Sequence, residues 1–287
     1  MTQMVEDPQA HGLTKVGGRP PLGAYLRDVL HRRDFIICLA KYRIEAENQK
    51  QRLGMAWVVL KPLLNAAVFG LVFGVLMASN HSTPDFIPFL LIGVFMFEFF
   101  GAAMNTGSKA ITNNTALVQS LAFPRMALPI SVVTQRFMQL VPTMLLLVPI
   151  LLVLGHRPTF SWLLVVPLLG LYYVFCVGVA LITARLTVHL RDLSNLLPFV
   201  TRFFFYTTGV FFAFDVRFAD QPRLVHAMEF QPVYAILSLA RELLLDSDPL
   251  FDVRMQLWPI VIGWAIVTLA FGAIYFWAAE ERYGRVS

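Results

Sequence analysis

Charged residues are scarce in this sequence. Asp, Glu, Lys and Arg make up 14% of its 287 residues, whereas a soluble domain carries about 25%. Hydrophobic residues make up 57%, and the mean hydropathy is +0.65. Such a composition excludes an ordinary soluble domain. The long apolar runs predict an all-α, polytopic membrane protein, because a helix satisfies its own backbone hydrogen bonds in lipid.

Cysteine is equally rare, with Cys38 and Cys176 alone. Two cysteines indicate neither a disulfide framework nor a metal site, and we interpret both as small apolar side chains. The motif G-x-x-x-x-G-K-[ST] is absent, so this chain cannot hold ATP by the P-loop mechanism. If the chain is an active transporter, its ATPase must therefore be a separate polypeptide, and we expect a transport subunit with no catalytic residues and no cofactor of its own rather than an enzyme.

An apolar leader is lacking as well. Residues 1–21 are polar and rich in Gly and Pro, which is untypical of a signal peptide and predicts a disordered cytoplasmic tail. The net charge is +5 and the isoelectric point is about 9.4. In a membrane protein this balance indicates basic side chains beside the cytoplasmic leaflet, and nucleic-acid binding is the weaker interpretation.

Six stretches are long and apolar enough to cross a membrane, since a crossing helix needs about 20 apolar residues. They are 56–78, 86–108, 127–154, 161–184, 196–214 and 257–279. We thus divide the chain into the tail 1–21, a cytoplasmic amphipathic region 22–54 and a six-span transmembrane domain 55–287.

Lys and Arg are distributed unevenly between the segments that join these spans. Alternate segments hold fifteen and five of them, and nine of the fifteen precede the first span. The positive-inside rule therefore places both termini, and the segment 109–126, in the cytoplasm.

Shorter amphipathic segments flank the predicted spans. In 22–54, apolar side chains recur at helical spacing between basic ones, which favours a helix in the membrane interface; packing on the protein's own cytoplasmic side is the alternative. Between spans five and six, "RLVHAMEF" and "PVYAILSLARELLL" are too short to cross. Pro222 and Pro232 are suited to helix starts, so we expect re-entrant helices there.

Two charges fall inside predicted spans. Glu98 and Arg136 lie on antiparallel neighbours, each about 12–15 Å from the cytoplasmic boundary at about 1.5 Å per residue. An unpaired charge near the bilayer centre costs about 2.5–3.5 kcal/mol, so we predict an ion pair or a shared polar network with Gln135 and Gln139. The alternative is an Arg136 that extends to the interface and a protonated Glu98. The two glutamines belong to a polar stripe that either packs helices together or lines a conduit.

Three stretches, in this order, resemble one family. They are "RLGMAWVVLKPLL" (52–64), "NNTALVQSLAFPRMALPISVV" (113–133) and "LRDLSNLLPFV" (190–200), and "QPVYAILSLARELLL" (231–245) is a weaker fourth match. They resemble the permease subunit of ABC-2 type transporters, in the branch that exports bacterial polysaccharides such as O-antigen, teichoic acid and capsule. The resemblance covers about residues 22–285 and is nearest to actinobacterial members that export lipid-linked cell-wall galactan.

This resemblance implies the partners and the setting of the chain. It implies a homodimer in the bacterial plasma (inner) membrane, a separate ABC ATPase that carries ATP and Mg, and a lipid-linked polysaccharide as substrate. It also assigns 112–122 to a cytoplasmic helix that docks into the ATPase. The residues of this helix and its exit are Asn114, Leu117, Val118, Leu121, Phe123, Pro124 and Arg125.

The residues of this segment are consistent with a rigid helix that passes movement of the ATPase to the next span. Leu117 and Leu121 share a helix face, and Pro124 cannot continue a regular helix, so the next span leaves at a fixed angle. An ordinary amphipathic connector that lies on the lipid is the alternative.

Two further groups suit a lipid-linked glycan. Seven aromatic residues lie in 203–214 and cannot all face one direction; sugar rings stack on aromatic side chains, so a subset is expected to line the conduit, with packing and an aromatic belt as the alternative. The conduit candidates are Phe204, Phe205, Tyr206, Phe211 and Phe212. Basic residues near the inner leaflet are candidates for binding a lipid headgroup, although positive-inside topology explains them equally: Arg43, Lys50, Arg52 and Lys61.

Other functions stay open at this point. An ABC-2 permease for a small hydrophobic molecule is the nearest alternative. A polyprenol-phosphate glycan enzyme is less favoured, because the cytoplasmic loops after the first span offer Asp192 as their one carboxylate, with His189 nearby. An ion-coupled transporter that uses Glu98 is a further alternative, but no inverted repeat is evident.

Overall fold

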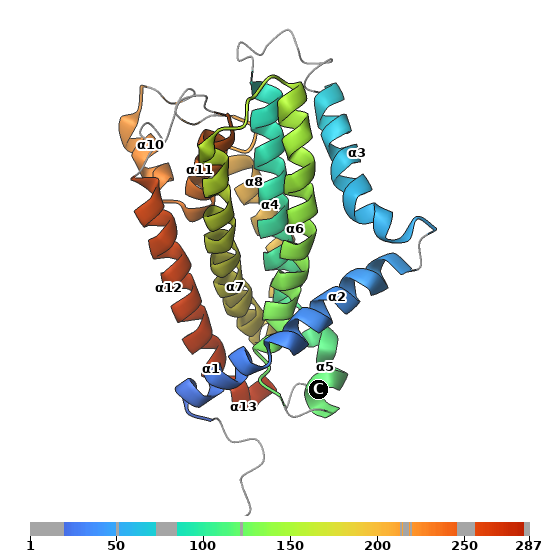
Figure 1. Cartoon of the computed structure of the whole chain (residues 1–287). Coiled ribbons are helices and arrows are strands. Elements are labelled where there is room, and N and C mark those ends of the chain that lie inside the picture. Colours follow the sequence, from blue (N-terminus) through green and yellow to red (C-terminus); the bar gives the residue numbers. More distant parts are fainter. Residues whose placement is uncertain are drawn as a thin grey trace, which may run out of the picture.

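The computed structural model describes residues 20–49, 52–72, 85–120, 123–212, 214, 218, 220–245 and 256–283. Within these ranges every regular element is a helix (Figure 1), as the sequence predicts. Of the expected tail 1–21, only Pro20 and Pro21 belong to the described residues.

Four helices are long and apolar enough to cross a membrane. They are α4 (Phe86–Ser108), α6 (Ala127–Val153), the helix Phe160–His189 made of η6 (Phe160–Leu164) and α7 (Val165–His189), and α12 (Leu257–Trp277). They coincide within a few residues with the second, third, fourth and sixth predicted spans, which are thereby confirmed as helices.

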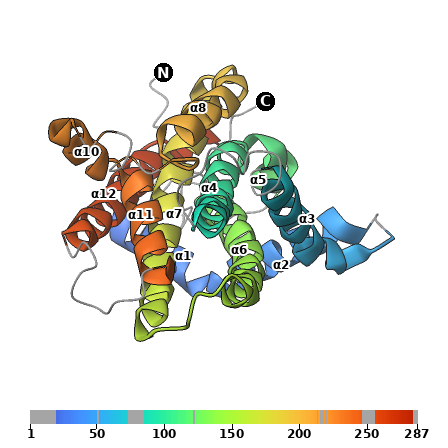
Figure 2. The ribbon, with the colours of Figure 1, turned by 90° about the horizontal axis from the view of Figure 1, so that it is seen from above.

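These helices form one bundle in which α7 contacts α4, α6 and α12 (Figure 1, Figure 2). The bundle's core is apolar and includes the fully enclosed side chains of Leu90, Ile92, Met96, Leu128, Leu147, Leu168 and Cys176. Helices α7 and α12 approach closely where Gly178 meets Gly272, because a Cβ at Gly178 would overlap the backbone of α12. Both cysteines are free; Cys176 packs as the small apolar side chain that we expected, whereas Cys38 is exposed.

The first predicted span is only partly described. Its beginning is η2 (Gly54–Ala56) and α3 (Trp57–Leu71), while 73–78 lie outside the described residues. Helix α3 contacts α4 and α6. Helix α2 (Arg33–Gln49) and the stretch Gly54–Phe69 meet at 102°, so α3 turns sharply away from the helix before it.

The fifth predicted span, 196–214, is not one continuous helix. Helix α8 covers Leu193–Thr207 and then ends in a turn at Thr208 and Gly209. Gly209 has a φ of 69°, a left-handed conformation that glycine adopts at little cost. The apolar run continues beyond this point, so composition alone suggested a longer helix. The six-span prediction is therefore not confirmed by the described residues, which contain four crossing helices, or up to five if the bent pair counts as one span.

A buried arginine explains why helix α8 can end at Thr207 inside the bundle. The Arg241 guanidinium donates from Nε to the carbonyl O of Phe89 at 3.1 Å, and from Nη1 and Nη2 to the carbonyls of Gly209 and Val210 at 2.9 Å each. It also lies 3.5 Å from the centre of the Phe89 ring. Backbone carbonyls after a helix end need donors inside an apolar bundle. Arg241 supplies them, so the broken helix stays enclosed.

Two short helices follow this break. Helix α10 (Pro222–Glu229) and helix α11 (Pro232–Leu245) both begin at proline, which confirms the predicted starts. Helix α11 has 14 residues and contacts α4, α7 and α12. At about 1.5 Å per residue it is too short to cross a membrane.

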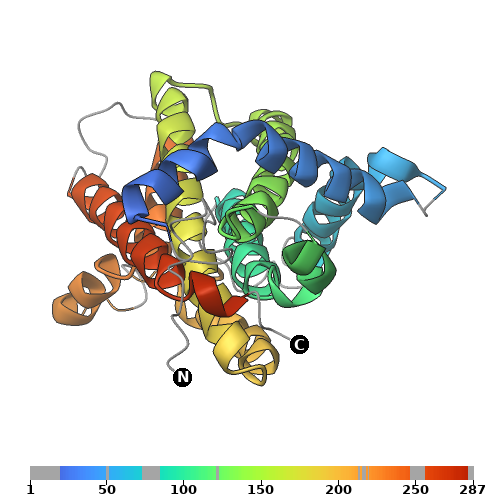
Figure 3. The same ribbon diagram turned by 90° about the horizontal axis from the view of Figure 1, so that it is seen from below.

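The remaining helices gather at one end of the bundle, which we call the basic end. Here lie α1 (Leu22–His31), α5 (Thr115–Ser120) and α13 (Glu280–Tyr283), at the bottom of Figure 1. Figure 3 shows α1 and α2 crossing this end. The face of α2 formed by Ile36, Ala40, Ile44 and Asn48 is buried, and α2 packs on α6. The segments richest in Lys and Arg thus share one end of the molecule.

Candidate functional site

A short helical segment connects α4 to α6 at the basic end. It consists of η5 (Thr112–Asn114) and α5, and continues through Phe123 to Pro124; Leu121 lies outside the described residues. Asn114 donates from Nδ2 to the carbonyl O of Ala110 at 2.7 Å, which links the start of the segment to the turn after α4. A helix is therefore present where the sequence predicts the coupling helix.

Of the residues that we expected on the docking helix, Val118 does not lie on the exposed side of α5. Val118 is only 4% exposed and packs in the core, and Leu117 is half-buried against it. The exposed side of the helix carries Ala116, Gln119 and Ser120. Val118 therefore anchors the helix to the bundle and is not available for contact with another protein, because its neighbours in this chain already cover it.

The exit of the segment is packed against the N-terminal region. The Phe123 ring lies 5.6 Å from the ring of Phe35 on α2, and Pro124 is buried. Aromatic pairs at this separation add to the stability of a contact. Movement of α5 would therefore displace α2 as well as α6.

Arg125 takes part in a buried cluster with Tyr25 and Glu280, which we call the Tyr25–Arg125–Glu280 cluster. The Tyr25 hydroxyl donates to Glu280 Oε2 at 2.8 Å, and the Arg125 backbone N–H donates to Glu280 Oε1 at 3.2 Å. The Met126 N–H donates to the Tyr25 hydroxyl oxygen at 3.1 Å. The Arg125 guanidinium also donates to the backbone carbonyl of Glu280 and lies 3.9 Å from its carboxylate. Three segments, α1, the start of α6 and α13, are thus joined at one point.

Burial controls the protonation of this cluster. It raises the pKa of the Tyr25 hydroxyl, which therefore keeps its proton and acts as a donor. Burial also raises the pKa of the Glu280 carboxyl, while the hydrogen bonds from Tyr25 and Arg125 oppose this shift. The cluster is consequently sensitive to replacement of any one member.

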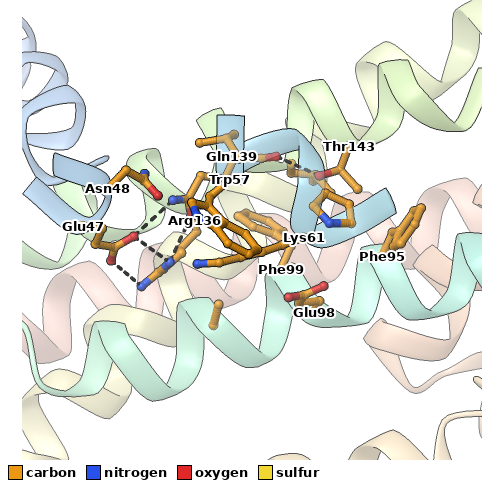
Figure 4. A pocket seen from close by; sticks show the side chains of 14 residues that line it. Glu47, Asn48, Trp57, Lys61, Phe95, Glu98, Phe99, Arg136, Gln139 and Thr143 are labelled. Carbon is orange, nitrogen blue, oxygen red and sulfur yellow. Dashed lines mark hydrogen bonds and ion pairs between the residues drawn. The ribbon is translucent and has the colours of Figure 1, made fainter. Parts of the chain in front are cut away.

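Glu98 and Arg136 lie in one pocket, but they do not form the expected ion pair. Arg136 instead binds Glu47 of α2, with Nη2 to Oε1 at 3.0 Å and Nη1 to Oε2 at 3.4 Å. Gln139 completes the contact, since its Nε2 donates to Glu47 at 3.2 Å and its Oε1 accepts from Arg136 at 3.0 Å. Figure 4 shows Glu98 pointing into the pocket that Arg136 also lines. Of the two outcomes that we predicted, the direct ion pair does not form, because α2 supplies a closer carboxylate to Arg136, whereas Glu98 and Arg136 do share one polar pocket.

The polar stripe of α6 divides between two environments. Gln139 and Thr143 line this pocket, which lies between α2, α3, α4 and α6. Gln135 does not line it and is buried, and its Nε2 has no hydrogen-bond partner among the described residues. Gln135 is therefore not part of the network that we predicted for it.

The headgroup candidates are also divided. Lys61 lines the pocket. Arg43 does not line it but interacts electrostatically with Arg136 and Glu47, which do. Arg52 is exposed in the turn before η2 and does not line the pocket, and Lys50 lies outside the described residues.

The conduit candidates face different directions, as their spacing requires. Phe204 and Phe205 pack toward α4, with the Phe205 ring 5.1 Å from that of Phe97. Tyr206 is 58% exposed and stacks at 6.0 Å on Phe211. Phe212 lies in the turn region, and its ring is 5.0 Å from that of Phe214. Of the five candidates, only Tyr206 presents most of its ring to the outside of this chain.

Sequence reasoning missed Tyr25, Glu47, Arg241 and Glu280. Two weak signs were available: Glu47 follows Arg43 by one helical turn, and Glu280 stands directly after an apolar span. Neither pattern identifies a partner, because each of these side chains binds a residue far away along the chain.

Comparison with known proteins places these features in a family. The model of the family described as ABC-2 type transporter matches residues 35–245. Two proteins of Klebsiella pneumoniae, both named O-antigen export system permease protein RfbA, are 26% and 22% identical to this chain over 184 and 215 residues. The first alignment covers 64% of this chain and 70% of the relative, and the second covers 75% and 81%.

A relative of the same name from Myxococcus xanthus is 24% identical over 245 residues, which cover 84% of this chain and 92% of the relative. The family match spans well over half of the chain, from α2 to the end of α11. It includes the segment between α4 and α6 and both short helices after the fifth predicted span. The chain therefore belongs to the ABC-2 type transporter family.

Proposed function

We propose that this chain is the permease subunit of an exporter that moves a lipid-linked polysaccharide across the bacterial plasma membrane. A separate ABC ATPase, which carries ATP and Mg²⁺, powers it. The observation that carries the proposal is the segment between two crossing helices of an ABC-2 family chain, in which α5 is exposed at the basic end and Arg125, which follows it, is bonded to Glu280 and through it to Tyr25. The similar proteins named O-antigen export permeases support the substrate class.

The contacts of α5 suggest how the ATPase acts on the bundle. An ATPase that pushes on the exposed side of α5 would move Phe123 and Arg125, which directly precede α6. Because Arg125 binds Glu280, and Glu280 binds Tyr25, the same movement would reach α13 and α1. The bundle would therefore respond at three helices to one push.

The proposal includes an orientation. The basic end faces the cytoplasm, with both termini there, since positive side chains favour that side. Helices α1 and α2 then lie along the inner membrane interface, and α11 is a re-entrant helix from the opposite side. Its buried surface and its length of 14 residues support this arrangement.

A homodimer completes the conduit. The described residues of one chain contain four crossing helices, or up to five if the bent pair counts as one span, which are too few to enclose a wide passage for a glycan. The outward face of α8 carries Phe199, Phe203 and Tyr206, which are 68%, 65% and 58% exposed. In a dimer, such rings would offer flat surfaces along which sugar rings slide without a fixed hydrogen-bond pattern.

Depletion of the protein in its own cell tests the proposal. We expect a lipid-linked glycan to accumulate on the cytoplasmic leaflet, with cell-wall galactan as the first glycan to assay, and the wild-type chain to reverse this. Arg125→Met should restore export poorly although the protein is inserted, whereas Arg223→Met, on the exposed surface of α10, should restore it fully.

The contrary outcomes are distinct. Depletion without any accumulated lipid-linked glycan, but with retention of a small hydrophobic compound, would assign the chain to the transport of small molecules. Loss of a glycan-modifying activity in membranes that hold normal amounts of substrate would favour a polyprenol-phosphate enzyme instead.

A further inference from the structure

The pocket between α2, α3, α4 and α6 encloses about 190 Å³ and is lined by several charged groups (Figure 4). Lys61 and Arg136 bring positive charge into it, and Glu47 and Glu98 bring negative charge. Polar cavities of this size hold several waters or one small polar group, since each water occupies about 30 Å³. Charged side chains around an open space are costly in a membrane protein, so a function for them is expected.

The positive groups around this pocket are incompletely paired. Within the described residues, Lys61 forms no hydrogen bond or ion pair, and Glu98 interacts with Lys61 and Arg136 only at longer range. Arg43 lies one helical turn before Glu47. Its Nη1 and Nη2, together with Arg136 Nε, are buried without a hydrogen-bond partner among the described residues. Three buried N–H donor atoms without acceptors call for an anion or water.

A phosphate group fits these donors. Its oxygens accept several charge-assisted hydrogen bonds, and guanidinium groups bind phosphate in a bidentate manner. Arg43 does not line the pocket, but it interacts electrostatically with Arg136 and Glu47 at its edge; counted with Lys61 and Arg136, it brings the cations here to three, against the two carboxylates of Glu47 and Glu98. A carboxylate or a neutral sugar would satisfy fewer of the donors, so phosphate is the better match.

One carboxylate already occupies the place of an anion. Glu47 binds both nitrogens of the Arg136 fork and the amide of Gln139, although its side chain is 43% exposed. Exposed carboxylates exchange readily, because a partly solvated ion pair contributes little to stability. This contact also fastens α2 to α6.

We propose that the pocket binds the phosphate group of a lipid by carboxylate exchange, an inference that rests on the proposed export function. Phosphate replaces Glu47 on Arg136 and is held by Lys61, and Glu47 turns to solvent. The bond between α2 and α6 at Glu47 is then lost. Since Phe35 of α2 contacts Phe123, the release reaches the exit of α5, where the ATPase acts. The permease would thereby register a loaded lipid before transport.

Binding is measured with the purified permease–ATPase complex in phosphatidylcholine nanodiscs. Farnesyl diphosphate is the lipid probe and inorganic diphosphate the soluble one. Trp57 lines the pocket, so its fluorescence reports occupancy, and the signal of a Trp57→Phe protein is subtracted. We expect saturable quenching by farnesyl diphosphate, with binding of inorganic diphosphate at least about tenfold weaker because it lacks the chain. Equal affinities would overturn the lipid assignment and identify a free-phosphate site.

Matched variants separate exchange from general charge effects. Glu47→Gln removes the competing carboxylate and should tighten farnesyl diphosphate binding by about threefold to tenfold. Glu45→Gln removes the same charge from an exposed position of α2 and should change it by less than about twofold. Arg136→Leu should abolish binding. Unchanged or weaker binding by Glu47→Gln would overturn the exchange.

The release of α2 has its own measurement. Spin labels at Ala46→Cys on α2 and Leu152→Cys on α6, in a Cys38→Ser chain, report the distance between the helices. Farnesyl diphosphate should shift this distance in the wild-type pocket and leave it unshifted in Arg136→Leu. Binding without any shift would overturn the release.

Failure of this inference differs from failure of the proposed function. If Arg136→Leu neither binds the probe nor loses glycan export in cells, the inference is wrong and the export function stands. If the probe binds as expected but depletion leaves no accumulated lipid-linked glycan, the export function is wrong.

Discussion

The Tyr25–Arg125–Glu280 cluster allows a quantitative test. Tyr25 and Glu280 are 3% and 7% exposed, and the hydroxyl donates to the carboxyl at 2.8 Å. Tyr25→Phe removes the donor, and Glu280→Met removes the acceptor at similar volume. A hydrogen bond to a charged group contributes about 1.5–3 kcal/mol, and burial limits screening by solvent. We therefore expect a coupling energy in this range from a double-mutant cycle on the free energy of unfolding.

The assay is unfolding of the purified protein by titration with SDS. The ion pair between Asp28 of α1 and Arg32, directly after the helix, is a matched control, because it has a 3.0 Å separation but side chains 48% and 41% exposed. Its cycle should give no more than about 0.5 kcal/mol. If the Tyr25–Glu280 coupling is no larger than that of the control pair, the cluster does not join α1 to α13 as described.

Three further predictions concern single positions. Burial raises the pKa of the Glu280 carboxyl above 4.5, so the folded chain binds this proton more tightly than the unfolded chain. The protonated carboxyl therefore stabilises the fold fully below about pH 4.5, and this contribution is lost as pH rises through the folded pKa. Glu280→Gln should remove this pH dependence in unfolding titrations. Gly93→Ala places a methyl group onto the Arg241 guanidinium and should destabilise the fold by about 1–3 kcal/mol, whereas Gly263→Ala on α12 meets open space and should not destabilise it, because alanine favours a helix over glycine by up to about 1 kcal/mol. Gly178→Ala should be at least as damaging as Gly93→Ala, because the added methyl group meets the rigid backbone of α12, and equal melting temperatures for Gly178→Ala and wild type would contradict the close packing of α7 and α12.

Much of the fold was predictable from local composition. The helices α4, α6, α7 and α12 coincide with long apolar runs, and the starts of α10 and α11 coincide with prolines. The fifth span was predictable only in part. Its apolar run passes through Thr208 and Gly209, and a glycine inside such a run does not by itself end a helix. The break depends on Arg241, which lies some thirty residues later and satisfies the freed carbonyls.

The candidate site was less predictable than the fold. The sequence located the segment between α4 and α6, but the direction of Val118 depends on the helices around it. It also identified Arg136 as a charge in need of a partner. The choice of Glu47 over Glu98 follows from the course of α2 across α6, which brings a second carboxylate within 3.0 Å.

The sequence by itself determined where helices form and that they belong in a membrane, because hydrophobic length and proline chemistry act within a few residues of the chain. The tertiary structure alone decided which polar groups meet. Tyr25 and Glu280 are 255 residues apart, Arg125 and Glu280 are 155 apart, and Arg136 and Glu47 are 89 apart. Burial in an apolar bundle makes such groups seek partners, and only the packing of the helices determines which partner lies within reach.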